Sequence, residues 1–252
     1  DSQLQELESF VRTDTDDVRL PLASSTTHTA QTNRAFVLNS SRNFSFEDRL
    51  LPELKSTRHV RVRVVATGLC GSDVSATMRS LVQVETLVFI SVLIQGPGPL
   101  LATRTHWLNV VEKPIVLGHE SAGIVEECGE DVKTLSVGDR VALEPGAGCN
   151  TCDICRSGRY NLCDSMQFAA TPPYDGTLST YYCLPEECCF TLPQHISLRE
   201  GALVEPLSIA VHCCSLAGNL QGKSVGVFGA GPVGLLCSAV AQAFGVSKVV
   251  NI

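Results

Sequence analysis

A glycine-rich segment near the end of the chain sets the strongest constraint on what it can fold into. Residues 223–228 have the apolar pattern of a buried strand, and residues 232–244 have that of a helix. Between them, residues 229–234 fit Gly-x-Gly-x-x-Gly, which seats a pyrophosphate on a helix N-terminus when it joins a strand to a helix. The candidate cofactor-binding residues are Gly229, Gly231, Pro232, Val233 and Gly234. A tight turn that binds no nucleotide is the alternative.

The following strand, expected at residues 247–252, normally ends in the residue that selects between NAD and NADP. In such sites a carboxylate for the ribose hydroxyls stands at the end of this strand, roughly 20 residues after the glycines. The given sequence stops at Ile252, before such a residue. The residues present therefore do not separate NAD from NADP.

Four cysteines in the middle of the chain have the spacing of a metal site. The pattern Cys-x2-Cys-x2-Cys-x7-Cys is formed by Cys149, Cys152, Cys155 and Cys163. Four thiolates can surround one Zn²⁺ as a tetrahedron and leave no position open, so we expect a structural site. Buried thiols without a metal are the alternative, which this specific spacing disfavours.

A second candidate metal site combines three different donors. His119 and Glu120 are adjacent and follow Gly118, and Cys70 is bracketed by two glycines. Imidazole nitrogen, carboxylate oxygen and thiolate sulfur all ligate Zn²⁺. Because adjacent side chains of a strand point to opposite faces, His119 and Glu120 need a turn to address one metal, and Gly118 can supply it. Taken alone, such a pair is more often a loop histidine beside a solvated carboxylate, and it is Cys70, the four cysteines and the glycine loop that favour a metal site.

Glu205 lies between the cysteine cluster and the glycine loop, and Pro206 follows it. A carboxylate at this point of the chain could reach a cleft between two domains. An acid that stabilises a helix start through the helix dipole is an equally good explanation.

The rest of the chain has mostly short elements. Strands are expected at residues 35–38, 44–46, 59–65, 139–141 and 177–184, and a long helix at 198–216. Residues 1–33 are polar and form a loose, poorly ordered extension in this interpretation.

Residues 74–104 differ in composition from the motif-bearing sequence on either side. They contain a mostly apolar run of 14 residues, Leu81–Ile94, which is too short to span a membrane. We interpret residues 74–104 as an insertion of doubtful structural value, with a translated intron as one hypothesis. Since an apolar run without a partner exposes a patch, removing the insertion is expected to raise solubility.

Composition narrows the class of protein. The chain has 252 residues, 44% of them hydrophobic, and a net charge of −7. This is the composition of a globular protein, and the negative charge argues against binding nucleic acid or an anionic membrane. Twelve cysteines without a secretory signal are interpreted as metal ligands and reduced thiols in a cytoplasmic protein.

Taken in order, these motifs resemble a known family. Gly68–Asp73, Gly118–Glu120, the four cysteines, Glu205-Pro206 and the glycine loop follow one another as in the zinc-dependent medium-chain dehydrogenases. Residues 161–163, 168–178 and 201–207 are most similar to the polyol branch, which contains sorbitol dehydrogenase and fungal xylitol dehydrogenase (D-xylulose reductase). The resemblance covers about residues 34–73 and 105–252.

The resemblance implies an α/β fold with a β-rich part. Residues 34–205 are then a GroES-like β-barrel catalytic domain that carries the doubtful insertion at 74–104. Residues 206–252 are the first part of a truncated Rossmann domain, a doubly wound parallel sheet that binds NAD. For the complete enzyme, the family implies a homotetramer.

The resemblance also implies roles for the site residues. Cys70, His119 and Glu120 correspond to the ligands of a catalytic zinc, and Glu205 corresponds to a carboxylate at the zinc and the substrate. Ser72 matches the hydroxyl that relays the proton. The cofactors implied are NAD and two Zn²⁺, one catalytic and one structural. The reaction implied is oxidation of a secondary hydroxyl of a polyol, xylitol to D-xylulose or sorbitol to fructose, with hydride transfer to NAD.

The sequence departs from the family in its spacing. Cys70 and His119 are 49 positions apart, about twice the usual separation, because residues 74–104 intervene. His106-Trp107 is a candidate for the family's pair of histidine and aromatic residue. With Cys70 displaced in sequence and half of the sheet absent, we expect the 252 residues alone to be inactive. The alternative function is that of a fragment that retains only zinc binding.

Overall fold

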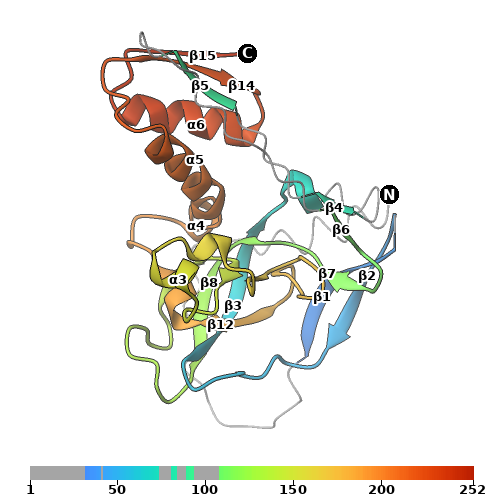
Figure 1. Ribbon diagram of the computed structural model, residues 1–252. Coiled ribbons are helices and arrows are strands. Elements are labelled where there is room, and N and C mark those ends of the chain that lie inside the picture. Colours follow the sequence, from blue (N-terminus) through green and yellow to red (C-terminus); the bar gives the residue numbers. More distant parts are fainter. Residues whose placement is uncertain (1–31, 41, 74–80, 84–88, 94–107) are drawn as a thin grey trace. The chain divides into compact units, whose positions relative to one another are not determined.

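The computed structural model describes residues 32–40, 42–73, 81–83, 89–93 and 108–252 (Figure 1). The expectations for residues 1–31 and for His106-Trp107 lie outside these ranges. The chain forms two compact units. Unit 1 contains the chain up to Val82 and Val110–Ala202, and unit 2 contains Gln83–Asn109 and Leu203–Ile252. Each unit is described by itself.

Unit 1 is built around a five-stranded antiparallel sheet of order β12-β3-β8-β9-β13. The strands are β3 (His59–Gly68), β8 (Glu120–Cys128), β9 (Arg140–Leu143), β12 (Tyr181–Pro185) and β13 (Cys189–Thr191). The alternation of polar and apolar residues in β3 has the expected result, because Val60 and Val62 are fully buried. Both pack in one core with Val125, Val141 and Leu184.

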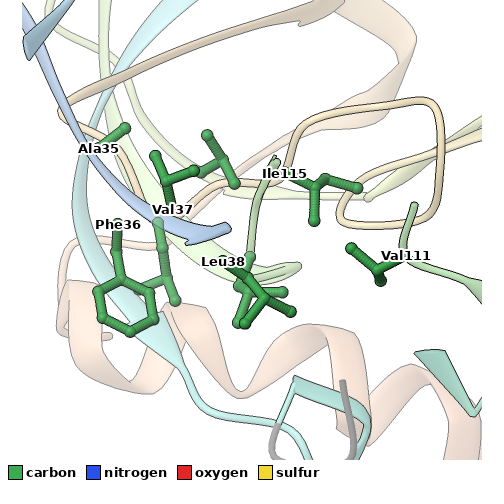
Figure 2. Packing of buried hydrophobic residues seen from close by; sticks show 9 residues of the cluster. Ala35, Phe36, Val37, Leu38, Val111 and Ile115 are labelled. Carbon is green, nitrogen blue, oxygen red and sulfur yellow. The ribbon is translucent and has the colours of Figure 1, made fainter. Parts of the chain in front are cut away.

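A second sheet of unit 1 has the order β2-β1-β7. Its strands are β1 (Asn33–Ser40), β2 (Asn43–Arg49) and β7 (Ile115–Val116), and the first two confirm the strands expected there. Figure 2 shows Ala35, Phe36, Val37 and Leu38 of β1 gathered with Ile115 and Val111 in a buried cluster. This cluster fixes β7 against β1, just before the segment that leads into β8.

Short elements complete unit 1. They are β10 (Gly146–Ala147), β11 (Gln167–Phe168), helix α3 (Asp153–Arg156), helix α4 (Leu198–Ala202), and the 3-10 helices η1 (Tyr160–Leu162) and η2 (Glu186–Cys188). The small pair of β4 (Leu81–Gln83) and β6 (Leu108–Val110) forms a separate sheet.

The single helix expected at residues 198–216 is wrong, since the structure divides it into α4 and α5 (Val204–Leu216). The break at Leu203 has a physical cause in Pro206. In a continuous helix, Pro206 would have to donate to the carbonyl of Ala202, but it has no N–H and its ring meets that carbonyl. As the third residue of α5, Pro206 needs no intrahelical partner. Among the described residues, no helix combines the length and the apolar character needed to cross a membrane.

Unit 2 has the strand–helix–strand order that the sequence predicted. β14 (Ser224–Phe228) and β15 (Lys248–Asn251) pair in parallel, and α6 (Pro232–Ala243) connects them. Helices α5 and α6 share a core with these strands, formed by Ala210, Cys214, Leu220, Val225, Val227, Cys237, Val240 and Ala241. In Figure 1, α6 lies along one face of the β14–β15 pair. The expected α/β class with a β-rich part is confirmed.

A strand from the segment interpreted as an insertion also belongs to unit 2. Residues Phe89–Leu93 form β5 and pair antiparallel with β14 over five positions, from Ser224↔Leu93 to Phe228↔Phe89. The sheet order is therefore β15-β14-β5, with β14 in the centre. Part of residues 74–104 thus gives β14 a second neighbour.

A buried carboxylate holds the loop between β8 and β9 to η2. Glu186 is 3% exposed and accepts hydrogen bonds from the amides of Lys133 and Thr134, at 2.9 and 3.1 Å, and from Arg58 Nη2 at 3.0 Å. The bond from the Lys133 amide, with those from Thr134 and Arg58, lowers the pKa of Glu186 from 4.5 to about 2. The ionised form is thus favoured in the folded state.

This pKa predicts how stability depends on pH. The folded-state pKa lies below the unfolded one, so the contribution of Glu186 is complete above about pH 4.5 and is lost as the pH falls towards 2. Glu186→Gln should therefore melt at a lower temperature than the parent at pH 6 and lose less stability between pH 5 and 2, as followed by circular dichroism. Glu130→Gln, which removes an exposed carboxylate, is the control. Parallel pH curves for Glu186→Gln and the parent would contradict the prediction.

The pairing of β5 with β14 reverses the expected result of removing the insertion. Without residues 74–104, one edge of β14 presents unpaired N–H and C=O groups, which can pair with another chain. The deletion protein should therefore self-associate more than the parent, as measured by size-exclusion chromatography with light scattering. Replacing only residues 95–104 by a Gly/Ser segment of equal length keeps β5 and serves as the control. A monomeric deletion protein with unchanged amide exchange in β14 would refute this role of β5.

Candidate functional site

The structure brings together the three donors that the sequence singled out. One ligand atom from each of Cys70, His119 and Glu120 lies within 4.8 Å of the other two. The pairing of β3 with β8 explains this, because Gly68 near the end of β3 stands opposite Glu120 at the start of β8. Cys70 follows β3 and His119 precedes β8, so the two residues meet where β3 ends and β8 begins, although 48 residues separate them in the sequence.

Gly118 makes the turn that this site requires. Its φ of +88° lies in the left-handed region, where glycine is favoured. A Cβ at this position would lie 2.7 Å from Cγ and 2.9 Å from the backbone nitrogen of Leu178, so a side chain does not fit either. The turn expected at Gly118 is confirmed. Gly68 also leaves necessary space, because a Cβ there would overlap Oε2 of Glu120.

Asp73 ties the two halves of the site together, and sequence reasoning gave it no role. It is 4% exposed, and its Oδ2 accepts from the amide of Cys70 at 3.1 Å while Oδ1 accepts from the amide of Gly118 at 3.0 Å. Oδ1 also lies 3.8 Å from Nδ1 of His119. A buried carboxylate that bridges two ligand-bearing turns orients the ligands as an outer-shell partner does. The signal available was an acid three residues after a turn cysteine.

Burial makes the three-donor group costly without a cation. Burial is the main cause that raises the pKa of Cys70, and a hydrogen bond from Ser72 opposes it. Burial likewise raises the pKa of Glu120. Two potential anions and an imidazole this close together favour a cation between them. Sulfur, nitrogen and oxygen donors suit Zn²⁺, and three of them leave the fourth position open, as in catalytic zinc sites.

The four-cysteine group also has the geometry of a zinc site. All four Sγ atoms lie within 4.8 Å of one another, with 3.9 Å between those of Cys149 and Cys155 and 4.0 Å between those of Cys152 and Cys163. Zn–S bonds of about 2.3 Å place neighbouring sulfurs about 3.8 Å apart in a tetrahedron. The amides of Cys152 and Cys155 donate to the sulfurs of Cys149 and Cys152 at 3.4 Å, which holds the loop around the four sulfurs. The group therefore fits a fully coordinated metal.

The glycine loop of unit 2 has the backbone that the motif predicts. Gly229 has a φ of +116°, and Gly231 is the N-cap of α6, followed by Pro232 and Val233 in its first turn. A Cβ at Gly234 would overlap the carbonyl oxygen of Gly229, so this glycine permits close packing of the helix start on the loop. Within the described part of the chain, no side chain caps the start of α6. Its first amides can therefore donate hydrogen bonds to an anion.

Glu205 is the second residue of α5 and belongs to unit 2, whereas the three-donor group belongs to unit 1. An acid in the first helical turn is stabilised by the helix dipole. Its position is therefore compatible with both explanations considered from the sequence.

The comparisons with known proteins agree with this fold and these sites. Residues 56–194 match the alcohol dehydrogenase GroES-like domain, which is more than half of the chain. The chain therefore belongs to this family, and the resemblance to the polyol branch of the zinc-dependent medium-chain dehydrogenases is confirmed. D-xylulose reductase A of Aspergillus niger is 48% identical over 228 residues, which cover 90% of this chain.

Solved structures show the same fold. Galactitol-1-phosphate dehydrogenase of Escherichia coli superposes with a TM-score of 0.71 at 28% identity, covering 86% of this chain and 55% of that one. 2R,3R-butanediol dehydrogenase of Bacillus subtilis gives 0.65 at 30% identity, with 87% and 57% covered. The chain spans 57% of the length of the Aspergillus niger relative.

The four-cysteine group predicts a specific loss of metal. Cys152→Ser should lower the zinc content of the purified protein by about one equivalent and destabilise residues 149–163, because metal binding and local folding are coupled. Elemental analysis and limited proteolysis measure the two effects. Cys128→Ser, which changes a cysteine outside both metal groups, should leave the zinc content unchanged. An unchanged zinc content in Cys152→Ser would refute the assignment.

Proposed function

We propose that the protein is a zinc- and NAD-dependent oxidoreductase that oxidises a secondary hydroxyl of a polyol, with xylitol to D-xylulose as the first candidate reaction and sorbitol to fructose as the second. The observation that carries this proposal is the convergence of Cys70, His119 and Glu120 within 4.8 Å in a chain that is 48% identical to a D-xylulose reductase. A three-donor site with an open position suits a substrate oxygen.

The residues of this chain have distinct parts in the proposed reaction. When bound, Zn²⁺ supplies a Lewis acid at the substrate oxygen and NAD supplies the hydride acceptor. Cys70, His119 and Glu120 hold the metal, and Asp73 fixes the turns that carry two of them. The Ser72 hydroxyl, which hydrogen-bonds to the Cys70 thiol, would relay the proton of the substrate hydroxyl, accepting that proton while it passes its own on towards solvent. This role of Ser72 rests on the family resemblance.

The cofactor site forms the second part of the proposal. Gly229 and Gly231 would let the backbone approach the pyrophosphate of a bound NAD, and Gly234 lets the start of α6 pack closely on the loop. The free amides at the start of α6 would donate hydrogen bonds to that pyrophosphate. Glu205 is proposed as a carboxylate at the zinc and the substrate. Two Zn²⁺ per chain are proposed, one catalytic and one structural at the four cysteines.

The domain organisation is part of the same proposal. Residues 34–205 form the catalytic domain, with 74–104 as an insertion, and residues 206–252 begin the NAD-binding domain. The division of the described chain between Ala202 and Leu203 supports this arrangement. We further propose a homotetramer that acts on a small molecule, as the family resemblance implies. A cytoplasmic location is proposed from the reduced cysteines, and the net charge of −7 argues against nucleic acid or an anionic membrane as partner.

A second candidate function is zinc binding alone. The four-cysteine group supports it, because this site is complete within residues 149–163 and needs nothing from unit 2. The chain also spans only 57% of its Aspergillus niger relative. A measurement of turnover separates the two functions.

The test is NADH formation with xylitol by two proteins. One is the 252-residue chain, and the other is a fusion in which the residues after Ile252 come from the Aspergillus niger D-xylulose reductase A. We expect turnover by the fusion and none by the 252 residues, since only the fusion completes the sheet and the ribose contact. Cys70→Ser in the fusion should lower kcat by about 100-fold or more, because the Lewis acid contributes several kcal/mol.

Cys183→Ser in the fusion is the control, since Cys183 belongs to neither metal group. Turnover by the 252 residues alone would show that the second half of the sheet is dispensable. A fusion that carries two zinc ions and binds NAD without turnover would reject the dehydrogenase function and leave zinc binding alone.

A further inference from the structure

The side chain of Phe168 contacts one metal group of unit 1, and its strand follows the other group in the chain. The ring of Phe168, in β11, is centred 5.8 Å from the imidazole of His119, and the two ring planes are tilted by 54°. These residues are 49 positions apart in the sequence. Offset or tilted ring pairs at this separation attract each other and fix the orientation of both rings.

The strand that carries Phe168 is also one arm of the four-cysteine loop. β10 ends just before Cys149 and β11 begins shortly after Cys163, and the two strands pair with Gly146 opposite Phe168. The amide of Met166 donates to the carbonyl of Cys163 at 3.0 Å. The placement of Phe168 therefore depends on the closure of the loop that the four cysteines form.

Gly146 leaves room for the Phe168 ring. A Cβ at Gly146 would lie 3.1 Å from Cδ2 of that ring and 3.0 Å from Sδ of Met166. On the far side of the pair, the amide of Ala169 donates to the carbonyl of Pro145 at 2.9 Å. The Phe168 ring therefore belongs to the closely packed β10–β11 pair, and this pairing holds the ring against His119.

His119 is therefore supported by two different parts of the fold. Asp73 holds the turn before it through the Gly118 amide and places a carboxylate oxygen 3.8 Å from Nδ1. Phe168 contacts the imidazole ring from the four-cysteine loop. Asp73 belongs to the site itself, whereas Phe168 connects it with the second metal group.

We propose that Phe168 is a positioning residue that couples the two metal groups: closure of the four-cysteine loop presses its ring on His119 and tightens metal binding at Cys70, His119 and Glu120. This inference rests on the two zinc sites of the proposed function. Partners that orient a ligand from outside the coordination sphere change metal affinity by about 10- to 100-fold. Coupling of two binding sites is reciprocal, so each metal should strengthen the other.

The first experiment measures zinc retention by the 252-residue chain in dialysis against a chelator series. The parent should retain two zinc ions and release them in two steps. Phe168→Ala should release the zinc of the three-donor site at about 10-fold lower chelator concentration. Phe168→Leu, which keeps most of the side-chain volume but removes the ring, should also lower the chelator concentration at which this zinc is released. Phe190→Ala is the matched control, because Phe190 is 52% exposed on β13.

The second experiment tests the route of the coupling with a double-mutant cycle. Cys152→Ser opens the loop, so it should weaken zinc binding at the three-donor site in the parent. In the Phe168→Ala background, the same change should add little, because the connection is already absent. Circular dichroism confirms that each variant retains the β-sheet of unit 1.

The outcomes separate this inference from the proposed function. A parent chain that retains one zinc, lost in Cys152→Ser, would reject the three-donor site and with it the coupling. Two zinc ions in the parent with unchanged release from Phe168→Ala would reject the coupling alone. Equal effects of Cys152→Ser in both backgrounds would show that the loop acts on the site by another route. Weaker zinc binding at the three-donor site on Cys152→Ser, confined to the parent background, would support the role of Phe168.

Discussion

The antiparallel pairing of β3 with β8 is the interaction on which the rest of unit 1 depends. Its register places Gly68, the last residue of β3, opposite Glu120, the first residue of β8. Cys70, two residues after β3, and His119, directly before β8, therefore meet at the same end of these two strands. The pairing is held by buried valines on one face, among them Val60, Val62 and Val125. A shift of one residue would turn these side chains to the other face and separate the ligands. Packing of the core and geometry of the site are therefore fixed together.

Local sequence patterns predicted those parts of the structure that local physics determines. The alternation around Val60 and Val62 predicted a strand, and the need for a turn if His119 and Glu120 are to address one metal pointed to Gly118, whose φ is positive. The glycine loop predicted the strand–helix–strand unit because the backbone there allows few alternatives. The four-cysteine group was predicted from the spacing of its cysteines in the sequence alone.

Other parts could not be predicted because they depend on contacts distant in sequence. Asp73 accepts from an amide 45 positions away, and Phe168 meets His119 across 49. No periodicity or motif within one segment contains that information. The break at Leu203 is different, since Pro206 was a visible signal whose effect on the Ala202 carbonyl was not used. The partner of β5 also depends on the sheet that forms more than a hundred residues later.

The long connection between Cys70 and His119 has a consequence for how this fold tolerates change. Both ends of the connection are anchored by the sheet, so extra residues in it affect the strand pairing at the site only through the entropy of closing a longer loop. Doubling such a loop costs about 0.6 kcal/mol, which is small beside the burial of a single valine. A segment can therefore enter this part of the chain without moving the donor atoms. The distance that matters for the chemistry is set across the strands and is independent of the number of residues between them.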